Sequence, residues 1–146
     1  MNFEVDKRIL ATCFDLGDWQ LSRIFLKNNQ HFPWVILVPK VAGVTAIDAL
    51  PKASRYQLIE EISQASHLIR SYFNIEKINV GALGNVVSQL HVHVIARDDR
   101  DLFWPQGVWQ AALPESPYPV GQVSVMLQAL KKMIKTCEKT AFSEAS

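Results

Sequence analysis

The chain has 146 residues, of which 49% are hydrophobic and 20% are charged, and its formal net charge is +1. This composition is typical of a globular protein, and the length fits one domain spanning residues 1–146. With neither a basic stripe nor a basic tail, the sequence gives no support to nucleic acid or an anionic membrane as the main partner.

We expect a cytoplasmic protein, because the sequence shows no targeting signal and its cysteines are not in a disulfide or metal motif. The longest apolar run, FPWVILVP, is far shorter than the roughly 20 residues of a membrane span. The N-terminus, MNFEVDKRIL, lacks the basic and apolar regions of a secretory signal. Cys13 and Cys137 are far apart and outside any C-x-x-C motif, so we expect them to be reduced.

The first recognisable elements are two strands, at residues 19–28 and 34–40. Between them, NNQHFP reads as a turn, and it is too short to contain a crossover helix. The two strands are therefore predicted to form an antiparallel hairpin. The rest of the sequence up to Lys40 is harder to place from its pattern.

A long helix is predicted over residues 54–73, followed by strands at 77–83 and 90–97 and a last helix from about Val120. The apolar stripe of the long helix consists of Leu58, Ile62, Ala65, Leu68, Ile69 and Phe73. Four polar side chains are expected to lie away from this stripe: Glu60, Glu61, Gln64 and His67. This order of elements predicts an α+β fold with an antiparallel sheet. The tail after Thr140 is harder to place.

The stretch SQLHVHVIAR, residues 88–97, carries polar side chains at alternate positions of a predicted strand. Side chains alternate across a strand, so Gln89, His91 and His93 share one face. The other face is apolar and is expected to pack on a helix, through Leu90, Val92 and Val94. Buried polar groups need partners, so the polar face requires an explanation.

Three interpretations of this polar face are open. The histidines lie on a half-exposed sheet, or they bind a metal ion, or they carry out nucleophilic or acid/base chemistry. A zinc site would need further ligands, and the candidates lie in no recognisable ligand motif: His31, His67, Asp98 and the cysteines. Imidazole is suited to catalysis at neutral pH, and a strand holds two rings rigidly.

QLHVHVIAR resembles the signature of the histidine-triad (HIT) superfamily of nucleotide hydrolases and transferases, in which three histidines alternate with apolar residues. Gln89 stands where the first histidine would be. Three further stretches are similar to family segments: the hairpin LSRIFLKNNQHFPWVILVPK, the approach NVGALGN and the segment FWPQGVW. The resemblance spans roughly residues 19–109 and is nearest to bacterial diadenosine-tetraphosphate-hydrolase-like members. It implies a HIT-like fold with about five antiparallel strands, a long helix and a C-terminal helix.

The resemblance also implies roles for individual residues. His91 would be the nucleophile that attacks the α-phosphate, His93 would contact the phosphoryl group, and Gln89 would lend its backbone carbonyl to orient His91. Asn28, or its neighbour Asn29, would bind the ribose. Asn79 and Asn85 would lie near the phosphates.

Two positions depart from the family pattern. Val86 stands where a serine or threonine is common, and Trp34 replaces a frequent histidine. We expect Trp104 and Trp109 to be packing residues, and Arg97 with the following DDRD charges to be a solvated strand end.

The function that the resemblance implies is hydrolysis at the α-phosphorus of a small-molecule nucleotide substrate. Dinucleoside polyphosphates such as diadenosine tetraphosphate, and nucleoside phosphoramidates, are the leading substrates. No cofactor and no protein metal site is expected, although a divalent metal could arrive with a polyphosphate. The resemblance also implies a homodimer. A nucleotidyltransferase and a weakly active nucleotide-binding protein are the alternatives.

Overall fold

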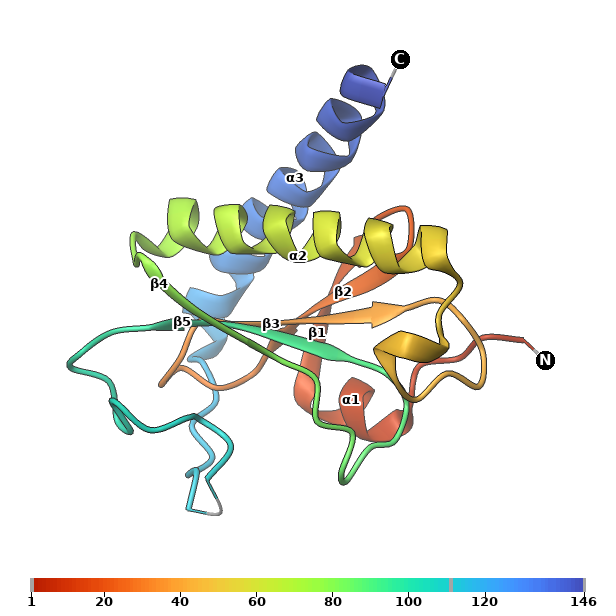
Figure 1. The fold of residues 1–146 in the computed structure, drawn as a ribbon. Helices are drawn as coiled ribbons and strands as arrows, with labels where there is room; N and C mark the ends of the chain where they lie inside the picture. The colour runs from red at the N-terminus through yellow and green to blue at the C-terminus, as the bar shows by residue number, and fades with distance from the viewer. Residues whose placement is uncertain (1, 111, 146) are drawn as a thin grey trace.

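An antiparallel sheet lies at the centre of the molecule (Figure 1). The computed structural model describes residues 2–110 and 112–145, with side chains described up to residue 137. The five strands of this part lie in the order β1-β2-β3-β5-β4. They are β1 (Cys13–Asp18), β2 (Ser22–Lys27), β3 (Trp34–Pro39), β4 (Lys77–Gly81) and β5 (Val92–Arg97). The predicted α+β fold with an antiparallel sheet is confirmed.

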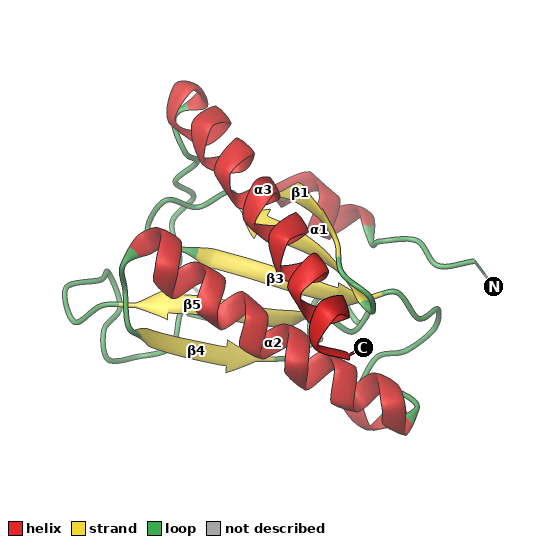
Figure 2. Cartoon of the chain, turned by 90° about the horizontal axis from the view of Figure 1, so that it is seen from above, coloured by secondary structure: helices red, strands yellow, loops and turns green. Residues whose placement is uncertain are grey.

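Helices lie on both faces of this sheet. The long helices α2 (Lys52–Phe73) and α3 (Val120–Ala145) lie on one face, and α3 extends past its edge (Figures 1 and 2). The short helix α1 (Lys7–Thr12) lies on the opposite face, next to the connection between β4 and β5 (Figure 1). A single 3-10 turn (Ile47–Ala49) precedes α2.

Strand β5 separates two apolar clusters because its side chains alternate. Val92, Val94 and Ala96 belong to the larger cluster, together with buried residues of α2 and α3. Ile95 belongs to a smaller cluster on the other face. This second cluster is completed by residues of α1, the hairpin and the segment after β5: Val5, Ile9, Phe25, Phe32, Trp34, Ile36, Val38 and Val108.

The element boundaries differ from the predicted ones in several places, and β4 ends at Gly81 rather than at residue 83. Helix α2 begins at Lys52, two residues earlier than predicted, and β5 begins at Val92, directly after His91. Residues 19–21 are not part of a strand, because Trp19 N donates to Ser22 O and closes the turn between β1 and β2. Helix α1 and strand β1 were not predicted.

Glu61 was predicted to lie away from the apolar stripe of the long helix, and that prediction is wrong. The side chain is buried and accepts hydrogen bonds from Leu21 N at 2.8 Å and Ser22 N at 2.9 Å. These two amides lie at the turn between β1 and β2, where they need an acceptor. The carboxylate therefore fixes α2 to this hairpin, and its spacing of three residues from Leu58 and four from Ala65 places it on the same side of the helix as the apolar stripe.

Cys13 and Cys137 are free thiols. No helix of the described residues is long and apolar enough to cross a membrane.

Candidate active site

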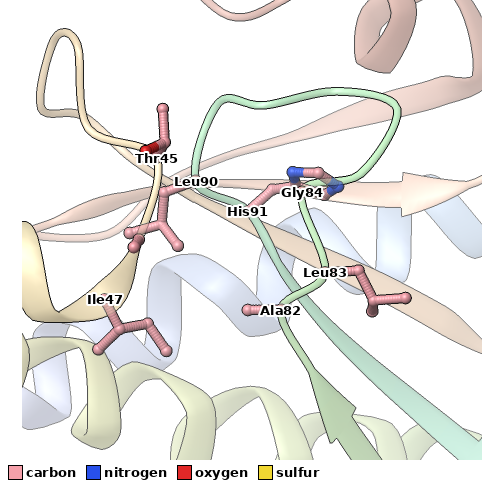
Figure 3. Close-up of a pocket in the computed structure, with 8 residues that line it drawn as sticks. Thr45, Ile47, Ala82, Leu83, Gly84, Leu90 and His91 are labelled. Atoms are coloured by element: carbon pink, nitrogen blue, oxygen red, sulfur yellow. The ribbon is translucent and has the colours of Figure 1, made fainter.

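The rings of His91 and His93 lie together at the beginning of β5. Their centroids are 4.8 Å apart, and both side chains are largely buried. His91 also lines a cavity of about 190 Å³ between the connection that precedes α2 and the connection that follows β4. Figure 3 shows its ring beside Gly84 of the second connection. Strand geometry therefore brings both predicted catalytic histidines to one place.

The hydrogen bond of His91 fixes where its proton lies. Nδ1 is 2.7 Å from the backbone oxygen of Gln89. A carbonyl oxygen only accepts, so Nδ1 must carry the hydrogen. In the neutral imidazole, Nε2 then has an unshared electron pair, which is the form that a nucleophile needs.

His93 has the opposite arrangement. Trp34 Nε1 donates to His93 Nδ1 at 2.9 Å, and an indole nitrogen only donates, so the His93 proton lies on Nε2. Burial, followed by the positive charges of a protonated His91 and of Lys27, lowers the pKa of His93 to about 3. His93 is therefore a neutral hydrogen-bond donor near pH 7. Trp34, noted in the sequence only as a departure from the family, sets this state.

The Gln89 side chain is directed at the N-terminal segment. Its Oε1 accepts from Asp6 N at 2.9 Å, and its Nε2 donates to Glu4 O at 2.7 Å. The side-chain amide of Gln89 thus binds one backbone N–H and one backbone carbonyl, as a strand residue does when it pairs with a neighbouring strand. The glutamine at this position ties residues 4–6 to the start of β5, while its own carbonyl holds His91.

The same N-terminal segment is tied to the connection between β4 and β5. Arg8 Nη1 donates to Val86 O at 2.9 Å, and the Arg8 guanidinium also binds Asp6. The side-chain and backbone hydrogen bonds from Arg8 lower the pKa of Asp6 to about 2. Position 86 therefore contributes its carbonyl to a structural contact, and its valine side chain is exposed. Asn85 is likewise exposed in this connection.

The two asparagines predicted at the ribose hold a later segment of the chain. Asn28 Oδ1 accepts from Tyr118 N at 2.9 Å, and Asn29 Nδ2 donates to Pro114 O at 3.1 Å. Both residues, with Lys27 and Pro114, line a cavity of about 380 Å³. The turn residues thus serve the structure and also face a cavity.

Arg97 was predicted at a solvated strand end, and the structure shows it 2% exposed. Its Nε and Nη2 donate to the Asp101 carboxylate at 2.7 and 3.1 Å. Nη2 also binds Gln106 O at 2.7 Å, and Nη1 binds Asn79 Oδ1 at 2.9 Å. Burial alone would raise the pKa of Asp101, but the hydrogen bonds from Arg97 and nearby amides hold it below its usual value.

Arg97 of this ion pair also binds the side chain of Asn79, which was predicted to lie near the phosphates. Asn79 pairs with Ile95 between β4 and β5, while Gly81 pairs with His93. Asn79 lies on the histidine face but two residues before Gly81 on β4, and its oxygen accepts from Arg97.

No group of three or more His, Cys, Asp or Glu side chains in the described chain is arranged to hold a metal ion. Around His93 lie the rings of Trp34, Trp109 and His91.

Comparisons with known proteins agree with this architecture. The model of the HIT domain family matches residues 11–100. A histidine triad protein from Marinobacter aquaeolei VT8 is 36% identical, with a TM-score of 0.88 over 93% of this chain and 98% of that one. A histidine triad protein from Bradyrhizobium japonicum is 32% identical, with a TM-score of 0.86 over 92% and 99%.

A third solved structure, a histidine triad protein from Sinorhizobium meliloti 1021, is 33% identical with a TM-score of 0.84. It covers 89% of this chain, and 96% of that protein is covered. The comparison with curated proteins found no match. The chain belongs to the HIT domain family.

Proposed function

We propose that the protein is a nucleotide hydrolase in which His91 Nε2 attacks the α-phosphorus of the substrate. The observation that carries this proposal is the hydrogen bond between His91 Nδ1 and Gln89 O, because it leaves Nε2 as the nitrogen with the free electron pair. HIT membership supports a nucleotide as the ligand.

The reaction has two steps. In the first, a bond forms between Nε2 and phosphorus as the bond from phosphorus to the leaving group breaks; a polyphosphate leaves as its anion, and a leaving amine takes a proton from solvent. In the second, water attacks the nucleotidyl-histidine and gives up a proton to solvent, and the nucleoside monophosphate leaves with His91 restored. The His93 Nε2–H is available to a phosphoryl oxygen in both steps. Since the pKa of His93 is about 3, it acts through a hydrogen bond from a neutral ring rather than as a cation.

Dinucleoside polyphosphates such as diadenosine tetraphosphate, and nucleoside phosphoramidates, are the proposed substrates. A divalent metal would enter with the polyphosphate and neutralise part of its charge. Asn28 and Asn79 serve the substrate only if their bonds to Tyr118 N and Arg97 are shared or exchanged, whereas Asn85 is exposed.

The direct test is hydrolysis of diadenosine tetraphosphate and an adenosine phosphoramidate by wild type and His91→Asn. We expect turnover by wild type and a loss of at least about a thousandfold in the variant, because the nucleophile is removed. His67→Asn, an exposed histidine on α2, is the matched control and should retain wild-type rates.

The other outcomes identify the alternatives. Exchange of label between nucleotide and an acceptor phosphate, with little hydrolysis, would show a nucleotidyltransferase. Tight nucleotide binding with equal, negligible turnover in wild type and His91→Asn would show a nucleotide-binding protein and contradict the hydrolase.

A homodimer is the proposed assembly. Strand β4 forms one edge of the sheet, and its side chain Val80 is an exposed apolar residue. An unpaired edge of this kind favours pairing with a second copy. Light scattering after gel filtration should give a dimer mass, and Val80→Lys should shift it towards a monomer. A monomeric wild type would contradict this assembly.

A further inference from the structure

Trp109 lies directly beside His93 without being fully buried. The ring centroids are 5.6 Å apart at an interplanar angle of 70°. The indole of Trp34 lies at the same distance from His93 and is buried, but Trp109 is 37% exposed. A large apolar ring that is partly open to solvent next to a catalytic group is unusual for a residue that only packs.

Strand β4 leaves room for this ring. Gly81 is the residue of β4 that pairs with His93. A Cβ at Gly81 would lie 2.7 Å from Trp109 Cη2 and 3.1 Å from Cζ2, which is closer than packed carbon atoms approach. The glycine therefore lets the indole lie against the β4 backbone at the level of His93.

The segment that carries Trp109 is held by buried contacts. Arg97 binds both Asp101 and Gln106 O, and Asp101 accepts from the amides of Phe103 and Trp104 at 3.1 and 2.7 Å. Val108, the neighbour of Trp109, is buried in the second apolar cluster. These contacts anchor the part of the segment that leads to Trp109.

On the side of β4, His93 is bordered by the partly exposed ring of Trp109. Over β2 and β3, the same face of the sheet is filled by buried apolar side chains of the second cluster, among them Phe25, Ile36 and Ile9. Over β4, the residue beside His93 is a glycine and the next surface is the exposed part of Trp109. A planar ring that reaches the histidines from this side meets the indole.

We propose that Trp109 is a substrate-binding residue that stacks on a heteroaromatic base in the leaving group. This assignment rests on the proposed function, and it favours dinucleoside polyphosphates, in which the leaving group is itself a nucleoside phosphate. Aromatic side chains stack on every base, so the preference is for a ring rather than for one particular base.

The test compares two ligands that differ only in the second nucleoside, diadenosine tetraphosphate and adenosine 5′-tetraphosphate. Their dissociation constants are measured by calorimetry in the His91→Asn protein, where the ligands are not consumed. With Trp109 present, diadenosine tetraphosphate should bind roughly 5- to 100-fold more tightly, as expected for one stacked base. Trp109→Leu should reduce this ratio to about one without changing the affinity for adenosine 5′-tetraphosphate.

Two further variants separate stacking from general disruption of the loop. Trp109→Phe retains a ring and should recover part of the ratio. Trp104→Phe is the matched control, because Trp104 is 39% exposed in the same segment but lies over Arg97, and it should leave the ratio unchanged.

A ratio near one with Trp109 intact, or a ratio that survives Trp109→Leu, would overturn the assignment of Trp109 and leave the proposed function standing. If neither ligand binds, the proposed function fails, and the assignment of Trp109 fails with it.

Discussion

The two faces of the sheet are stabilised by different kinds of contact. Under α2 and α3, the face is built from apolar side chains such as Leu58, Ile69, Leu130 and Val94. The opposite face has a smaller apolar cluster, and next to it His91, His93 and Arg97 are buried. Apolar burial is non-directional, whereas each buried polar group needs a partner at a defined position.

The polar face shows what this requirement means for function. Its partners come from distant segments: Trp34 for His93, Asp101 for Arg97, and residues 4–6 for Gln89. The bond from Trp34 to His93, and the bond between His91 and the Gln89 carbonyl, determine which nitrogen of each imidazole carries the proton. On this face the contacts that satisfy buried polar groups therefore also set the protonation of the two histidines.

The largest effect is expected from Arg97→Met. The substitution leaves the Asp101 carboxylate without its buried partner, which typically costs about 3–5 kcal/mol of unfolding free energy. Arg100→Met is the control, since Arg100 is exposed and solvent screens its pairs with Asp98 and Asp99, so this variant should unfold nearly as wild type does. Urea unfolding of both variants measures the difference. Equal losses of unfolding free energy in the two variants would contradict a larger contribution from the buried ion pair.

The next largest effect concerns pH. The native pKa of His93 is about 3, below the usual value of 6.5 for an exposed histidine. As the pH falls below 6.5, His93 becomes protonated in the unfolded chain but stays neutral in the native state. The free energy of unfolding should therefore fall until about pH 3. Between pH 7 and pH 4 the loss from this group is roughly 2–4 kcal/mol.

The control for this prediction is His93→Asn. Its Oδ1 is placed to accept from Trp34 Nε1 as Nδ1 does, but the amide does not titrate. The unfolding free energy of this variant should therefore change less between pH 7 and pH 4 than that of wild type. Identical pH dependence of the two proteins would mean that His93 is not held neutral by burial.

A smaller effect is expected from Gln89→Ala. The variant loses the bonds to Glu4 O and Asp6 N, with an expected cost of about 1–2 kcal/mol. Amide exchange at Asp6 should accelerate, whereas kcat should fall less than about tenfold, because the bond to His91 comes from the backbone of residue 89. Gln128→Ala on the exposed side of α3 is the control. A loss of activity as large as that of His91→Asn would contradict a backbone role.

The elements with long, regular patterns could be predicted from the sequence. The apolar spacing of α2 and the alternation in β5 gave both elements, within two residues at their starts. Helix α1 and strand β1 are each six residues long, and β1 has a register shift between Asp15 and Gly17 that breaks the alternation. Short and irregular elements depend on tertiary contacts that a local pattern does not contain.

The site could be predicted only in part, for the same reason. Alternation placed His91 and His93 on one face, and the structure agrees. The burial of Arg97 could not be foreseen, because its acceptors Asp101, Gln106 O and Asn79 come together only in the folded chain. In the sequence, Arg97 is followed by further charged residues, a pattern typical of an exposed strand end, and nothing in it shows that Arg97 pairs with Asp101.

The central claim is that His91 Nε2 is the nucleophile, and its most direct test is the covalent intermediate. Wild-type protein is mixed with diadenosine tetraphosphate, quenched within a turnover and digested for mass spectrometry. We predict a peptide that contains His91 and carries one adenosine monophosphate group bound through phosphorus to nitrogen, absent from His91→Asn. Turnover without any adduct, or an adduct on a different residue, would contradict the account.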